Sequence, residues 1–269
     1  RTPGTAGNRK TWTWAGWVKR SKIGSSDWLF TASSGSATHY LTFGDAAADV
    51  LTFARYNGSS HDFRLSFANK FRDPAAWYHI ILAVDTAQAT STNRVKIYVN
   101  GQQLTDYGTN SYPSQNAEYE LNSTAAHGIG SNVGTYASSP DLLSGYLADI
   151  HFIDGQALDP SYFGYTDPLT NTWRPKKLSS SVAFGTNGFY LPFDGSAPIG
   201  QDQSGRGNNW TPVNFGGSNT LEKATGALPI LNTDGGGKVA RVGVRTDSSA
   251  SSLVLALPLV GIKSDFSNA

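Results

Sequence analysis

Apolar and polar residues alternate with a period of two in segment after segment of this chain, whereas no stretch keeps an apolar period of 3.6 residues over three turns. Alternate side chains of a strand point to opposite faces of a sheet, so the pattern predicts strands and argues against long helices. Gly, Ser, Asp and Asn separate these segments, as tight turns require. The expected strands are 11–19, 28–32, 40–43, 50–56, 63–67, 76–85, 94–104, 145–158 and 188–193.

Two of these segments are expected in the interior. Segment 11–19 carries aromatic side chains on both faces, with Trp12 and Trp14 on one face and Trp17 on the other. Segment 76–85 is almost continuously apolar, as is typical of a strand that is covered on both sides. We therefore expect both to be central strands.

Three turn signals follow the expected strands. Asn100-Gly101 supplies the two positive φ values that a type I′ hairpin turn needs. Asp154-Gly155 is a second tight-turn pair, which predicts another hairpin within 145–158. Asp159, followed by Pro160, is a capping residue that predicts one short helical turn over 161–164.

Many short strands in 269 residues, with 12% aromatic and only 15% charged residues, predict an all-β, two-sheet antiparallel jelly-roll sandwich of roughly a dozen strands. Residues 1–178 should form the sandwich. Residues 179–215 should add a closing edge strand, which contains Pro192, and an Asp-Gln-Ser-Gly loop packed on the sandwich. The Gly/Ser-rich segment 216–269 should be an extended C-terminal arm that reaches a neighbouring subunit or follows the sandwich edge.

Charge and composition argue against several classes of function. The net charge is +1 and the basic residues are scattered, so we expect no nucleic-acid partner. The longest apolar run, 253–260, is far shorter than the ~20 residues that span a bilayer, so we expect no membrane insertion. Without cysteine there is no disulfide, thiolate metal site or cysteine nucleophile. The absence of Met, even at position 1, indicates a longer or processed product.

Catalytic patterns are sparse. Only Glu118 and Glu120 among three glutamates are neighbours, and a solvated strand edge explains this pair better than the paired acids of a glycan hydrolase. No Gly-x-Ser-x-Gly elbow occurs, and the five histidines are dispersed without metal-ligand spacing. His79 and His151 lie in apolar strands and are expected to be structural. We therefore predict no catalytic residue and no enzyme.

Sugar binding needs exposed aromatic faces with polar partners for hydroxyl groups. Aromatic residues in or beside loops rich in Asn, Gly, Ser or Asp are the candidates. They are Tyr56, Tyr107, Tyr112, Tyr136 and Trp210.

The order of motifs over about residues 9–165 resembles laminin G-like and pentraxin-like concanavalin A folds. The resemblance is carried by Trp17-Val18, Trp77-Tyr78-His79, Val84-Asp85 and the Tyr-Val-Asn-Gly turn at 98–101. Many such domains bind calcium at a rim, and the resemblance implies a candidate calcium site; no other cofactor is expected. Its candidate ligands are Asp194, Asp202, Ser204 and Asn208, for which plain turn stabilisation is the favoured alternative.

Segments 9–14, 152–158 and 202–212 are similar to large virion proteins of marine bacteriophages. This resemblance implies a non-enzymatic structural protein on the virion surface: a head decoration, a fibre or a tail adhesin. Its expected partners are other virion proteins or copies of itself, with a cell-surface glycan as a further candidate. The alternative is a secreted or virion-borne glycan hydrolase of the concanavalin A-like fold.

Overall fold

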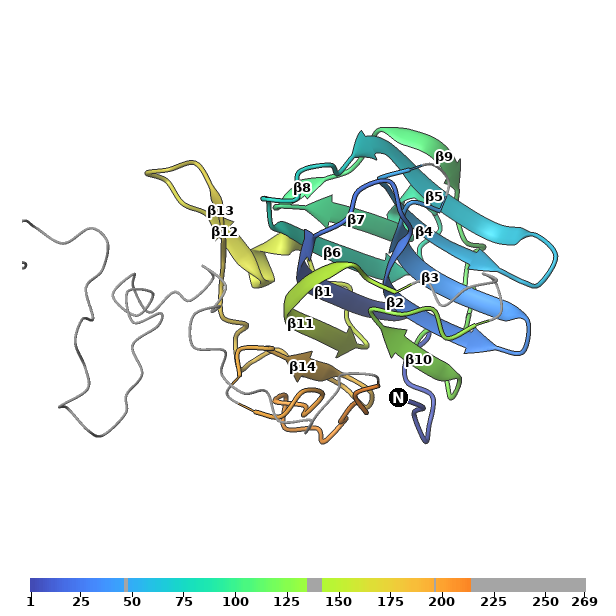
Figure 1. The fold of residues 1–269 in the computed structure, drawn as a ribbon. Coiled ribbons are helices and arrows are strands. Elements are labelled where there is room, and N and C mark those ends of the chain that lie inside the picture. Colours follow the sequence, from blue (N-terminus) through green and yellow to red (C-terminus); the bar gives the residue numbers. More distant parts are fainter. Residues whose placement is uncertain (46–47, 135–141, 196, 214–269) are drawn as a thin grey trace, which may run out of the picture. The chain divides into compact units, whose positions relative to one another are not determined.

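Two antiparallel six-stranded sheets form the body of a sandwich (Figure 1). The first sheet contains, in spatial order, β14 (Phe189–Leu191), β11 (Gly145–Asp154), β1 (Thr11–Arg20), β6 (Tyr78–Asp85), β7 (Val95–Val99) and β8 (Gln102–Gln103). The second sheet contains β10 (Ala126–Ile129), β2 (Asp27–Ser34), β3 (Ala37–Phe43), β4 (Val50–Tyr56), β5 (His61–Lys70) and β9 (Tyr107–Ser111). The predicted all-β sandwich is confirmed.

The computed structural model describes residues 1–45, 48–134, 142–195 and 197–213. Arg1–Phe193 and Ile199–Phe215 belong to one compact unit, which contains both sheets. A second unit comprises Asp194–Pro198 and Gly216–Ala269. The predicted arm, 216–269, lies outside the described residues. In the described part of the chain, no helix is long and apolar enough to cross a bilayer.

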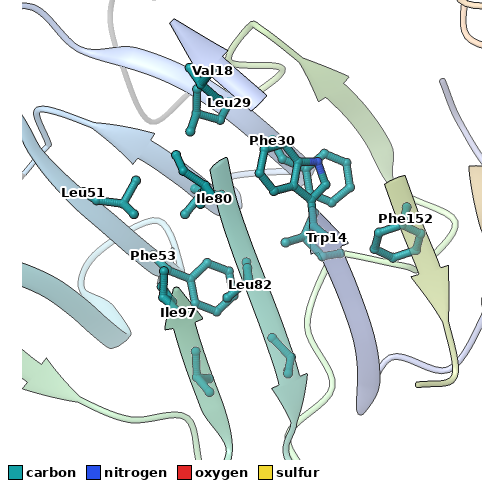
Figure 2. Close-up of a cluster of buried hydrophobic side chains, with 14 of the residues drawn as sticks. Trp14, Val18, Leu29, Phe30, Leu51, Phe53, Ile80, Leu82, Ile97 and Phe152 are labelled. Atoms are coloured by element: carbon teal, nitrogen blue, oxygen red, sulfur yellow. The ribbon is translucent and has the colours of Figure 1, made fainter. Parts of the chain in front are cut away.

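The core lies between the two sheets and is built from the alternate side chains of each. Trp14, Ile80 and Phe152 of the first sheet meet Phe30 and Phe53 of the second, and all five are at most 2% exposed (Figure 2). Burial of apolar surface stabilises a fold by roughly 25 cal/mol per Å². Large buried aromatic side chains therefore contribute strongly to the stability of this sandwich. The alternate side chains of the two sheets therefore form one shared hydrophobic core.

Strand β1 is central, as predicted, with β11 on one side and β6 on the other. Trp12 and Trp14 point into the core between the sheets, while Trp17 stacks on His79 on the outer face with ring centroids 4.6 Å apart. The outer face of the first sheet is covered by a smaller apolar cluster that includes Ile81, Leu158 and Phe163. Strand β6 is thus buried on both faces, which explains its continuous apolar sequence.

The Asn100-Gly101 hairpin is confirmed. Asn100 and Gly101 have φ values of 50° and 79°, and they join β7 to β8. The predicted helical turn is also present, as a short 3-10 helix, η2 (Pro160–Tyr162), whose first turn is capped by the Asp159 side chain accepting from the Ser161 amide.

The predicted second hairpin within 145–158 is wrong. Strand β11 ends at Asp154, and its neighbours are β1 and β14 rather than the segment that follows it. The Asp154 carboxylate is buried and accepts hydrogen bonds from the backbone amides of Asn8, Thr186 and Asn187 and from the Asn122 side chain, at 2.7–3.1 Å. Its donors come from remote segments, so Asp154 joins loops instead of shaping a local turn.

Several strands were not predicted. The edge strands β9 and β10 are short and polar or glycine-containing, so they lack the alternating signal. Strands β12 (Gly164–Thr166) and β13 (Trp173–Pro175) form a separate two-stranded hairpin that extends from the sandwich (Figure 1). Besides η2, the other short 3-10 helix among the described residues is η1 (Ser91–Asn93).

Candidate functional site

A row of paired residues crosses all six strands of the second sheet on its outer face. From strand to strand the pairs are Gly128 with Thr31, Thr31 with Tyr40, Tyr40 with Ala54, Ala54 with Arg64, and Arg64 with Ser111. The neighbours of these residues along each strand, such as Leu41, Phe53 and Leu65, point into the core. The sheet therefore presents Tyr40 and Arg64 on the same outward side.

Six residues gather around this row, and we call them the outer-face cluster: Trp28, Tyr40, Asp45, Tyr56, His61 and Arg64. The rings of Trp28 and Tyr40 have centroids 4.9 Å apart and are buried. Tyr56 and His61 form an edge-to-face pair at 5.4 Å and are half-buried. The cluster thus has an aromatic floor and a rim that reaches solvent.

Hydrogen bonds connect the polar groups of the cluster. The Tyr40 hydroxyl donates to Asp45 Oδ2 at 2.9 Å, and Arg64 Nη2 donates to the same oxygen at 2.7 Å. His61 Nε2 lies 2.8 Å from the Tyr40 hydroxyl. Because the single hydroxyl proton is directed to Asp45, the network assigns the proton of this last bond to His61 Nε2.

The charges of the outer-face cluster balance. Asp45 and Arg64 form a partly screened ion pair, with side chains 11% and 25% exposed. Burial lowers the pKa of His61, and the positive charge of Arg64 lowers it further, while Asp45 and Asp62 oppose the shift. His61 is therefore neutral at pH 7, and the cluster carries no uncompensated charge.

The structure separates the predicted glycan-binding aromatics. Tyr56 belongs to the outer-face cluster. Tyr107 packs on Phe67 at 4.8 Å and on Tyr112 at 6.1 Å, beside the edge of the sandwich. Burial and the hydrogen bond with Tyr112 raise the pKa of Tyr107. Tyr107 and Tyr112 are half-buried and pack against the core between the sheets.

Trp210 also packs against the core. Its ring centroid lies 4.9 Å from that of Phe189 and 6.4 Å from that of Phe30. Tyr136 lies outside the described residues. Of the four candidates that the structure describes, Tyr56 is the one that belongs to a cluster with polar groups suited to sugar hydroxyls.

Asp202, the most buried of the candidate calcium ligands, is surrounded by hydrogen-bond donors. Asp202 Oδ1 accepts from the amides of Tyr190 and Ser204, and Oδ2 accepts from the Ser204 hydroxyl and the Asn208 amide, at 2.8–2.9 Å. Calcium needs oxygen lone pairs directed at the ion, so this carboxylate, surrounded by N–H and O–H groups, does not fit a metal ligand. Asp194 belongs to the second unit. Among the described residues, no group of three or more Asp, Glu, His or Cys side chains is placed to hold a metal.

The two neighbouring glutamates were predicted to lie on a strand edge. They lie instead in the loop between β9 and β10. Glu120 is 8% exposed and accepts from Arg55 Nη2 at 2.7 Å and Nε at 3.1 Å. Glu118 lies 3.5 Å from Arg9 Nη1 and 3.7 Å from Lys10 Nζ. The hydrogen bonds that Arg55 donates to Glu120, and further to Asp62, raise the pKa of Arg55. Each glutamate is therefore paired with a cation, and the two have different partners.

The strand histidines are structural in their contacts. His79 is stacked on Trp17 and accepts a hydrogen bond at Nδ1 from Trp173 Nε1 at 2.9 Å. His151 stacks on Tyr190 with centroids 4.3 Å apart. Burial lowers the pKa of His79 to about 3 and that of His151 to about 4, so both are neutral at pH 7.

Comparison of the sequence with models of known protein families identifies the family of this fold. A family model described as the concanavalin A-like lectin/glucanases superfamily matches residues 1–161. The chain belongs to this superfamily. The match covers β1 to β11 and includes every strand that builds the outer-face cluster. A superfamily that holds both lectins and glucanases fixes the fold but leaves the choice between binding and hydrolysis to the site.

Solved structures with a similar arrangement include a pentraxin from Limulus polyphemus, with 16% identity, a TM-score of 0.41, and 58% of this chain and 69% of that chain covered. A candidate carbohydrate-binding protein from Bacteroides ovatus has 16% identity and a TM-score of 0.49, with 77% of this chain and 52% of that chain covered. Domain 4 of an extracellular arabinanase from Geobacillus stearothermophilus has 15% identity and a TM-score of 0.38, with 57% and 65% covered. No curated protein sequence matches the chain. Membership of the superfamily therefore depends on the family model.

Sequence reasoning missed Tyr40, Asp45, His61 and Arg64 of the outer-face cluster. The available signal was the alternation in β3 to β5, where Tyr40, Ala54 and Arg64 fall between core residues. Strand pairing, which cannot be read from the sequence, brings these positions together.

Proposed function

We propose that the chain is a non-enzymatic glycan-binding module whose sugar site is the outer-face cluster. The observation that carries this proposal is the combination of a half-buried aromatic ring, Tyr56, with the hydrogen-bonding groups of Asp45, His61 and Arg64. Sugar recognition uses such pairs, since C–H groups stack on a ring while hydroxyl groups bond to planar polar side chains. Membership of a superfamily that includes lectins supports the same function.

Hydrolysis is the alternative, and the arrangement of carboxylates favours binding over it. A glycosidase usually needs two carboxyl groups on either side of the scissile bond, one of them protonated at working pH. Glu118 and Glu120 are engaged by Arg9 and Arg55, and Asp45 is engaged by Arg64. Each of these three carboxyl groups is engaged in an ion pair, so none of them is placed as the free proton donor that a glycosidase needs.

We further propose that the module works on the surface of a bacteriophage particle, as a head decoration, fibre or tail adhesin. The support is the similarity of segments 9–14, 152–158 and 202–212 to virion proteins. Its partners there are other virion proteins or copies of itself, together with the host glycan. Immunogold labelling of purified particles tests this role: a chain found free and never on particles contradicts it.

A glycan array tests the binding function. We expect wild-type protein to bind a subset of glycans and Tyr56→Ala to weaken binding by about tenfold, since contacts with an aromatic ring are worth on the order of 1 kcal/mol. Tyr146→Ala is the matched control, because Tyr146 is 61% exposed but lies on β11 of the first sheet. An equal loss in both variants, or no binding by the wild type, contradicts the proposal.

A reducing-sugar assay on algal and bacterial polysaccharides tests the alternative. We expect no release of reducing ends. Release that disappears in the double variant Glu118→Gln/Glu120→Gln would replace the binding function with hydrolysis.

A further inference from the structure

We propose that the outer-face cluster selects uncharged sugars over acidic ones, with Arg64 and Asp45 acting as a donor and acceptor pair for neighbouring hydroxyl groups. This inference rests on the proposed glycan-binding function and specifies its ligand class.

Arg64 provides the donors. A guanidinium group has five N–H donors, and the one hydrogen bond that Arg64 makes to described residues is from Nη2 to Asp45. Its Nε is buried and has no hydrogen-bond partner in the described part of the chain. The guanidinium therefore keeps N–H groups for which the described residues supply no acceptor, and those that reach solvent are suited to an incoming oxygen. The side chain is 25% exposed and can be reached from solvent.

Asp45 decides the charge of the ligand. Its carboxylate is 2.7 Å from Arg64 and already neutralises that guanidinium. A sugar carboxylate placed on Arg64 would therefore also lie close to Asp45, and like charges at such distances repel. No second cation of the cluster compensates, since His61 is neutral and its Nε2 proton is directed to Tyr40.

A hydroxyl group meets both demands, because it accepts from Arg64 and donates to Asp45 at the same time. Trp28 and Tyr40 form an apolar floor under this pair, and Tyr56 supplies a ring at the rim. The cluster is therefore complementary to a neutral pyranose with adjacent hydroxyl groups and one apolar face.

Matched sugars provide the test. Surfaces printed with terminal glucose, galactose and mannose are compared with the corresponding glucuronic, galacturonic and mannuronic acids, which differ only in a carboxylate at C6. We expect the wild-type protein to bind at least one neutral sugar about tenfold more tightly than its uronic acid, which corresponds to about 1.4 kcal/mol. Preference for the uronic acid overturns the inference while leaving glycan binding intact. No binding to any glycan removes the proposed function itself.

Three variants test whether the selectivity depends on the Asp45–Arg64 pair. Asp45→Asn should narrow the preference for the neutral sugar by about threefold, because it removes the like charge. Arg64→Gln should weaken binding of the neutral sugar by about tenfold, and Arg64→Lys, which keeps the charge but not the planar fork, should recover only part of it. Circular dichroism and thermal unfolding establish that each variant is folded. A folded Asp45→Asn protein with unchanged selectivity contradicts the assignment.

Discussion

Arg20 shows how much one buried side chain organises in this protein. It is fully buried at the end of β1, where Nε donates to Asp27 at 2.8 Å and Nη1 donates to Asp49 at 2.9 Å. Nη1 also donates to the Phe71 carbonyl at 2.7 Å, and the guanidinium lies 4.8 Å from the Phe43 ring centroid. One cation therefore connects three separate parts of the chain, at Asp27, Asp49 and Phe71.

Arg20→Met should lower the free energy of unfolding by about 3–5 kcal/mol, because the buried Asp27 carboxylate loses its cationic partner and the Asp49 carboxylate loses the buried one of its two. Urea unfolding measures this change. Arg72→Met is the matched control, since Arg72 also donates to Asp49, at 3.1 Å, but is 55% exposed and should cost less than about 1 kcal/mol. If the two variants lowered the free energy of unfolding by similar amounts, the buried ion pairs of Arg20 would not be more important than the exposed pair of Arg72.

At the scale of elements, the β7–β8 turn is a packing surface as well as a turn. A Cβ on Gly101 would lie 2.5 Å from the Trp173 ring, and Gly164 makes a similar close approach to the same ring. Trp173 donates its Nε1 proton to His79, so this side chain attaches the β12–β13 hairpin to the first sheet. The hairpin and the turn hold each other in place.

Gly101→Ala should therefore destabilise the fold by two effects, the positive φ of 79° and overlap with Trp173. Gly155→Ala isolates the first effect, because Gly155 has a φ of 95° and no atom lies within 4 Å of the place that a Cβ would take. We expect Gly101→Ala to cost about 1–3 kcal/mol more than Gly155→Ala in thermal or urea unfolding. Equal costs would mean that the Trp173 contact moves aside freely.

For the whole molecule, buried histidines set the response to acid. Burial lowers the pKa of His79 to about 3 and that of His127 and His151 to about 4, from 6.5 in the unfolded chain. Between these values the unfolded state binds more protons than the folded state, so stability falls as the pH decreases. Above 6.5 all three are neutral in both states and their contribution is fully present.

We expect the free energy of unfolding, measured in urea at about pH 7, 6, 5 and 4, to fall progressively once the pH is below the unfolded-state pKa of histidine. His79→Gln should make this decline shallower, because one of the histidines with a lowered pKa no longer takes up a proton on unfolding. The slope rather than the absolute stability is the readout, since the substitution also removes the contact with Trp173. A flat profile in the wild type would contradict neutral burial of these histidines.

Local patterns in the sequence were enough to predict the all-β class, the central position of β1 and β6, and the Asn100-Gly101 hairpin. These follow from side-chain alternation and from backbone preferences, which act between residues that are close along the chain. The sequence also predicted the capped turn at Asp159. Its prediction of a hairpin at Asp154 failed because that carboxylate is satisfied by Asn8, Asn122, Thr186 and Asn187, none of which is local.

Contacts between polar residues of the candidate site depend on how the strands pair in the folded protein. Tyr40, Asp45 and Arg64 lie on different segments, and the register of β3, β4 and β5 makes them neighbours. The tertiary structure likewise turned Tyr107, Tyr112 and Trp210 into packing residues, because strand pairing and core closure decide which aromatic faces remain in solvent. A local pattern states which face a side chain takes, while its partners depend on contacts that form only when the sheets close over the core.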